Sequence, residues 1–118
     1  MVTVDQLTDA ALKLDNLTLR SLAQDFLNEA KPIRNYPRPL TDDPTALAVA
    51  AGLLELLALR LRQQPPQWTS EIGPSPQPMF LIKAAESMKR LRQLCETESP
   101  EPLRRRRLYA PPNFLEFV

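Results

Sequence analysis

Two groups of carboxylates have a spacing that could support acid–base or metal chemistry. Asp42 and Asp43 are adjacent, and Glu96, Glu98 and Glu101 lie close together further along the chain. Neighbouring carboxylates can share a proton or bind a cation. Asp43, however, precedes a proline in the pattern of a helix cap, and the three glutamates straddle the expected end of a helix. We therefore predict solvated carboxylates and assign no catalytic or metal-binding residue.

The remaining composition argues against catalysis. The chain has no histidine, which removes the commonest general base and metal ligand, and its single cysteine, Cys95, cannot build a zinc site. None of the glycine-rich phosphate-binding motifs occurs, and the sequence holds only two glycines. We therefore expect a protein that is not an enzyme and that uses no cofactor.

Cys95 and the N-terminus bear on the cellular compartment. A reactive thiol is one interpretation of Cys95, because Lys89, Arg90 and Arg92 would favour its thiolate. Its place on the apolar face of a predicted helix favours the other interpretation, a buried structural cysteine. A single cysteine fits a reducing compartment, and the first residues lack the pattern of a signal peptide. We expect a cytoplasmic protein.

Four consecutive arginines, Arg104 to Arg107, lie in the basic half of a chain whose charge is unevenly divided. Residues 1–58 hold eight acids and five bases, a net −3, whereas residues 59–118 hold six acids and ten bases, a net +4. Successive helical residues rotate by about 100°, so four adjacent arginines cannot share one face. At least one should point into the domain and pair with a carboxylate, either on the acidic N-terminal helices or in a partner.

The residues that follow the arginines need a burial site as well. Phe114, Leu115 and Phe117 are apolar, so residues 98–118 are predicted to form an ordered docking segment in a groove of this chain or of another. Trp68, in a proline-rich stretch, is interpreted either as a binding aromatic or, in preference, as a cover over the helices. The residues assigned to partner contact are Arg104, Arg105, Arg106, Arg107, Tyr109, Phe114, Phe117 and Trp68.

Helical periodicity and capping signals predict the elements that carry these residues. Thr3 with Gln6 forms a capping box, and Asp15 and Asp43 are further caps. The helices expected are a short one over 4–14, a second between Asp15 and Pro32, a third from Pro44 to about Gln63, a fourth from about Met79 to Glu96 and a short fifth over 100–107. No stretch shows the alternation of a strand. We predict one all-α domain, 1–118, a compact bundle of four to five helices with proline-rich connections.

The third helix should form the centre of the core. Its apolar run from Ala46 to Leu59 spans 14 residues and includes Glu55, whereas a bilayer crossing needs about 20 apolar residues. The sequence therefore predicts a buried helix and no association with a membrane.

Three stretches of the C-terminal half carry a resemblance to a known family. "PPQWTSEIGPSPQPMFL", "LRQLCETESPEPLRRRR" and "APPNFLEFV" resemble parts of a family of small uncharacterised bacterial proteins whose genes lie beside those of predicted nucleotidyltransferases. The similarity covers about the last sixty residues. It implies an antitoxin-like or accessory role beside a partner enzyme, and it carries no site residue onto this chain.

Three functional hypotheses follow, of which the least favoured is an enzyme or a purely structural helical module. The first is a non-enzymatic protein-interaction module, whose partner is a nucleotidyltransferase-type enzyme or a second copy in a homo-oligomer. The alternative is a nucleic-acid-binding protein that presents Arg104 to Arg107, with Lys89, Arg90 and Arg92, to phosphates. A net charge of +1 and an aromatic content of 6% favour the first hypothesis.

Overall fold

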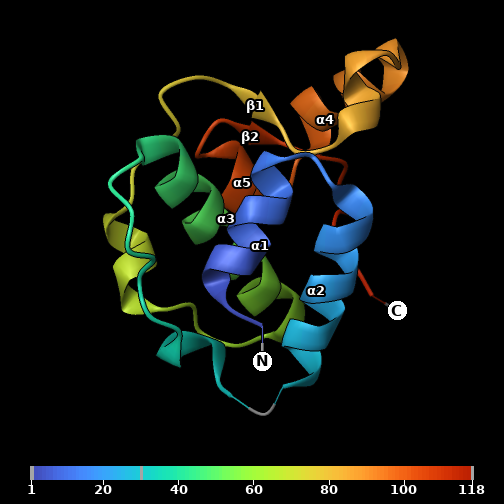
Figure 1. Cartoon of the computed structure of the whole chain (residues 1–118). Helices are drawn as coiled ribbons and strands as arrows, with labels where there is room; N and C mark the ends of the chain where they lie inside the picture. The colour runs from blue at the N-terminus through green and yellow to red at the C-terminus, as the bar shows by residue number, and fades with distance from the viewer. Residues whose placement is uncertain (1, 30, 118) are drawn as a thin grey trace.

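Helices dominate the computed structural model, which describes residues 2–29 and 31–117 (Figure 1). The α-helices are α1 (Val4–Leu12), α2 (Asn16–Asn28), α3 (Pro44–Leu61), α4 (Lys89–Glu98) and α5 (Glu101–Arg104). Short 3₁₀ turns are η1 (Ile33–Asn35), η2 (Gln67–Glu71) and η3 (Lys83–Glu86), and two-residue strands are β1 (Met79–Phe80) and β2 (Leu108–Tyr109). The predicted all-α bundle is confirmed.

The first three helices begin at the predicted caps. The Oγ1 of Thr3 accepts from the backbone N–H of Gln6 at 3.1 Å, and the Gln6 side chain accepts from the N–H of Thr3 at 2.9 Å. Asp15 caps α2, and Asp43 caps α3 one residue before a proline at the first helical position. These contacts satisfy N–H groups that a helix leaves free at its start, which explains why the chain becomes helical at these residues.

The third helix, α3, lies at the centre of the core, as predicted. Every residue from 46 to 58 is buried, and the helix packs against α1 on one side and against α5 and η2 on another. At Gly52 the approach of α5 and β2 is so close that a Cβ would lie 3.1 Å from a Leu103 methyl and 3.2 Å from a Leu108 methyl. Even a methyl group at Gly52 would therefore require the side chains of Leu103 and Leu108 to shift by a few tenths of an ångström.

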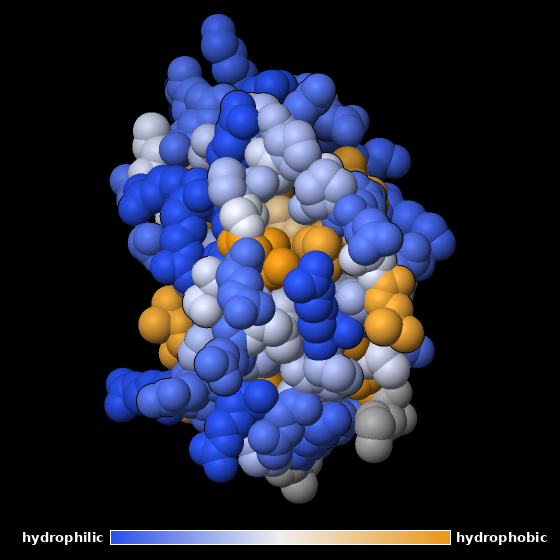
Figure 2. Space-filling view, turned by 90° about the vertical axis from the view of Figure 1, so that its left-hand side faces the viewer, coloured by the Kyte–Doolittle hydropathy of each residue, from blue (hydrophilic) through white to orange (hydrophobic). Residues whose placement is uncertain are grey.

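The burial of α3 also bears on the membrane question. By length and composition alone this helix could cross a bilayer, but 72% of it is buried inside the chain, as expected of a core helix. On the face seen in Figure 2, hydrophilic side chains cover most of the surface, and apolar atoms show in a central hollow and in isolated spots near the edges.

The predicted start of the fourth helix at Met79 is wrong. Met79 and Phe80 instead pair in parallel with Leu108 and Tyr109, and the N–H of Leu81 donates to the Tyr109 carbonyl at 2.9 Å. The backbone groups that a helix would need are thus engaged by a segment distant in sequence. The helix α4 begins only at Lys89, after η3.

The last predicted helix is also shorter than expected. It covers Glu101–Arg104, and residues 105–107 form a turn in which Arg107 has a left-handed φ of 63°. This turn brings the chain into β2, so the sequence after the arginines returns to the core.

Candidate functional site

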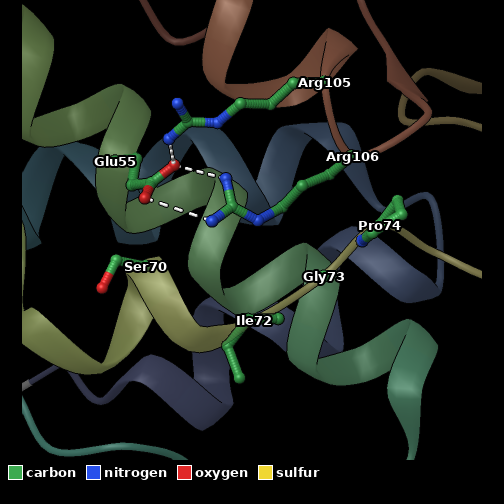
Figure 3. Close-up of a pocket in the computed structure, with 7 residues that line it drawn as sticks. All are labelled: Glu55, Ser70, Ile72, Gly73, Pro74, Arg105 and Arg106. Carbon is green, nitrogen blue, oxygen red and sulfur yellow. Dashed lines mark hydrogen bonds and ion pairs between the residues drawn. The ribbon is translucent and has the colours of Figure 1, made fainter.

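A buried carboxylate on α3 brings two of the four arginines together (Figure 3). Glu55 is 7% exposed and Arg106 is 4% exposed. The Arg106 guanidinium spans both carboxylate oxygens, with Nη2 3.1 Å from Oε2 and Nη1 on Oε1, and Arg105 donates to Oε1 from the other side. We call these three residues the Glu55 cluster.

Carbonyl oxygens complete the surroundings of Arg106. Its Nη2 donates to the Thr69 carbonyl at 2.7 Å and its Nη1 to the Pro102 carbonyl at 3.3 Å, while its buried Nε has no partner in the part of the chain that the structure describes. Planar guanidinium groups form forked contacts of this kind with a carboxylate. The cluster therefore links α3, η2 and α5 at one point.

The electrostatics of the cluster fix its protonation. Burial raises the pKa of the Glu55 carboxyl, but hydrogen bonds from Arg106 and Arg105 outweigh burial, so the pKa lies below its usual value. The hydrogen bond to Glu55 in turn raises the pKa of Arg105. A carboxylate held ionised by two cations is a poor general acid or base near neutral pH. The cluster is suited to holding the fold together.

A cavity of about 320 Å³ borders the cluster on its solvent side. Its lining residues are Glu55, Ser70, Ile72, Gly73, Pro74, Arg105 and Arg106 (Figure 3). The charged groups that face it already pair with one another, which leaves no isolated charge for a ligand. Over residues 2–29 and 31–117, no group of three His, Cys, Asp or Glu side chains could hold a metal ion, and the carboxylate groups noted in the sequence form none.

The other two arginines of the run bond to nearby backbone. Arg104 donates to the Thr97 carbonyl at 3.3 Å, and Arg107 donates to the Pro76 carbonyl at 3.0 Å. The run points in different directions, as predicted, and one arginine, Arg106, points inward. Its carboxylate comes from the central helix α3, whereas the prediction had named the N-terminal helices or a partner.

The C-terminal aromatic residues dock on this chain itself. Phe114 is 7% exposed and belongs to the core, and Arg60 donates to the carbonyls of Pro112 and Phe114, each at 3.0 Å. Phe117 is half-buried, with the Arg20 guanidinium 4.7 Å from its ring centre. The docking segment therefore lies in a groove of its own chain, which answers a question that the sequence left open.

The remaining predicted contact residues are partly covered. Tyr109 is half-buried, with its ring 5.6 Å from that of Phe80. Trp68 is half-buried against the core, and its indole N–H donates to the Tyr36 carbonyl at 2.9 Å. This packing agrees with the interpretation of Trp68 as a cover, and its contact with a partner stays a prediction. Cys95 is fully buried, and burial raises the pKa of its thiol, as expected of a structural cysteine.

A surface on α4 was missed in the sequence. This helix lies at one end of the molecule, outside the layers formed by α1, α2 and α3 (Figure 1), and Cys95 is its one buried residue. Met88, directly before the helix, is 55% exposed, and Leu94 is 41% exposed. We define the α4 surface as the exposed residues Met88, Lys89, Arg90, Leu94 and Glu98.

Comparison with known proteins adds no relative: no family model, no curated protein and no solved structure matches the chain. The resemblance to proteins encoded beside nucleotidyltransferases therefore stays a prediction from the sequence.

Proposed function

We propose that this chain is a non-enzymatic protein-interaction module that binds its partner through the α4 surface. The observation that carries the proposal is the exposure of Leu94 on α4 and of Met88 directly before it, with the cations Lys89 and Arg90 in the first turn of the helix. Large exposed apolar side chains grouped with charged residues are typical of protein-binding surfaces.

The arginine run supports this role indirectly. Arg104 bonds to the last turn of α4 through the Thr97 carbonyl, and Arg105 and Arg106 fix the adjacent α5 to α3 through Glu55. These contacts inside the chain fix the C-terminal end of α4 and the adjacent α5 to the core helix α3. A rigid surface loses less entropy on binding than a mobile one.

Two partners fit the proposal. An accessory or antitoxin-like role beside a nucleotidyltransferase-type enzyme rests on the resemblance of the C-terminal half, and a second copy of the chain rests on the residues of α4. Against catalysis, the one buried carboxylate of the Glu55 cluster is held ionised by two arginines. That the chain is not an enzyme stays a prediction.

An affinity experiment tests the α4 surface. Tagged wild-type chain and the Leu94→Asp variant are exposed to lysate of the native host, and retained proteins are identified by mass spectrometry. We expect the wild type to retain a protein that Leu94→Asp loses. Leu61→Asp is the matched control, because Leu61 is 38% exposed on α3 and Leu94 is 41% exposed. Equal retention by all three folded chains would contradict the proposal.

Nucleic-acid binding is a second candidate, favoured by the exposure of Lys89, Arg90 and Arg92 on α4. Of the four arginines predicted to face phosphates, Arg106 is buried on Glu55. Binding to duplex DNA whose affinity falls with salt by a log–log slope of about 0.9 per phosphate, and which persists in Leu94→Asp, would favour this candidate over the first.

A further inference from the structure

We propose that the partner of the α4 surface is a second copy of this chain, with the two α4 helices antiparallel and Leu94 on the two-fold axis. This inference rests on the proposed function, since it takes α4 as the contact surface, and it names the partner.

The geometry of one stripe on α4 points to this arrangement. Arg90, Leu94 and Glu98 follow at intervals of four residues, so each is rotated by only about 40° from the previous one and displaced by about 6 Å along the axis. All three side chains are exposed. The stripe therefore has a cation at one end, an apolar residue in the middle and an anion at the other end, at equal distances from the middle.

Such a stripe is complementary to itself when it is reversed. A two-fold axis through Leu94 places Arg90 of one copy opposite Glu98 of the other, twice, and Leu94 opposite Leu94. A parallel arrangement would instead oppose like charges. Within the described residues neither Arg90 nor Glu98 forms an ion pair, whereas Arg92 and Glu96, on the other side of the helix, pair at 3.7 Å. The charges of the stripe are available for a second copy.

The direction of the charges along α4 supports the same conclusion. Three of its first four residues are basic (Lys89, Arg90 and Arg92), and its last three include two glutamates. This order opposes the helix dipole, whose positive end is the N-terminus. No side chain caps the first turn of α4. In an antiparallel pair the glutamates of one copy approach the basic, uncapped first turn of the other. Their negative charge offsets both the unfavourable order of charges along the helix dipole and the lack of a side-chain cap.

The size of the contact predicts a weak dimer. Ten helical residues span about 15 Å, so the pair buries less than the roughly 1,200 Å² of a standard interface. Because its ion pairs lie at the surface, the association should weaken as salt is added.

Charge reversal tests the pairing by sedimentation velocity over a range of concentrations. The mean mass of the wild type should rise from that of one chain toward that of two. Arg90→Glu alone and Glu98→Arg alone should each weaken self-association by about tenfold, because each opposes like charges twice. An equimolar mixture of the two variants should recover the association, since the pairs are then complementary. Lys83→Glu is the matched control: it changes the charge equally but lies on η3, outside the α4 surface, and it should dimerise like the wild type.

A cross-link gives a second measurement that does not depend on charge. Under mild oxidation Leu94→Cys should form a disulfide between two chains, because the axis brings the two positions together, and Lys89→Cys should not. Thermal melts by circular dichroism confirm that each variant is folded.

Three outcomes would overturn the inference. They are a monomeric wild type at millimolar concentration, a dimer indifferent to both charge reversals, and a mixture that does not recover. If the wild type is monomeric but Leu94→Asp still loses a retained protein, the second-copy inference fails and the proposed function stands. If Leu94→Asp changes neither mass nor retention, both fail.

Discussion

Replacing Arg106 with methionine should destabilise the fold more than replacing any other arginine of the run. Methionine fills a similar space without the charge, so Glu55, at 7% exposed, would lose its forked partner, and the Thr69 carbonyl would lose its donor. Removing one partner of a buried ion pair costs about 3 to 5 kcal/mol. Because Arg105 still contacts Glu55, we expect about 3 kcal/mol, a large share of the roughly 5 to 15 kcal/mol typical of a domain.

Urea denaturation followed by circular dichroism measures this loss. The midpoint should fall at an unchanged slope, and the melting temperature should fall by about 10 °C. Arg104→Met is the matched control, because Arg104 is exposed and makes one backbone contact at 3.3 Å. Its loss should stay below about 1 kcal/mol.

A double variant tests the cause of the loss. In Glu55→Leu with Arg106→Met neither charge of the forked pair remains buried, so the double variant should lose less than the sum of the two single losses. The buried pair would be refuted as the contact that holds the C-terminal segment to α3 by either of two results. One is an equal loss of unfolding free energy in Arg106→Met and Arg104→Met, and the other is a loss in the double variant that equals the sum of the single losses.

Three further predictions follow from the described contacts. The pKa of Glu55 lies below its usual value of 4.5, so the ionised carboxylate contributes fully to stability above pH 4.5 and loses this contribution as the pH falls further. The difference in melting temperature between wild type and Glu55→Gln should therefore shrink on acidification. A difference that stays constant with pH would contradict this. Phe114→Ala should lower the free energy of unfolding by about 3 to 5 kcal/mol in urea, since the ring lies in the core, whereas a loss of partner binding without destabilisation would show that the ring serves a partner instead. Burial and the hydrogen bond to Glu29 raise the pKa of Tyr36 to about 12. In an alkaline absorbance titration Tyr36 should therefore ionise above the usual tyrosine value of 10.0, and Tyr36→Phe should remove that step.

The features that were predicted correctly depend on residues close in sequence. The capping box of Thr3 and Gln6 spans three residues, and Asp43 acts on the next turn of its own helix, so both can be recognised locally. Likewise, the rotation of about 100° per residue was enough to predict that one arginine of the run points inward.

The features that were missed depend on partners far away in the chain. Met79 pairs with Leu108, and the Asn16 side chain binds the Leu81 carbonyl and the Lys83 N–H, so contacts outside the segment end the predicted helix. The choice of Glu55 as the carboxylate for Arg106 also depends on a contact across 51 positions. Helical periodicity alone carries no information about such contacts, and the exposure of α4 follows from them.

The pairing of β1 with β2 also has a consequence for the order of events during synthesis. The chain between these strands contains α4 and α5, so α3 meets Leu103, Arg106 and Leu108 only after all intervening residues have left the ribosome. Until then Glu55 has no guanidinium to neutralise it, and the face of α3 around Gly52 is uncovered. Contacts of long sequence separation slow folding relative to a bundle of neighbouring helices. We therefore expect nascent chains that end before Arg106 to be protease-sensitive, so that the last twenty residues decide when the whole domain becomes folded.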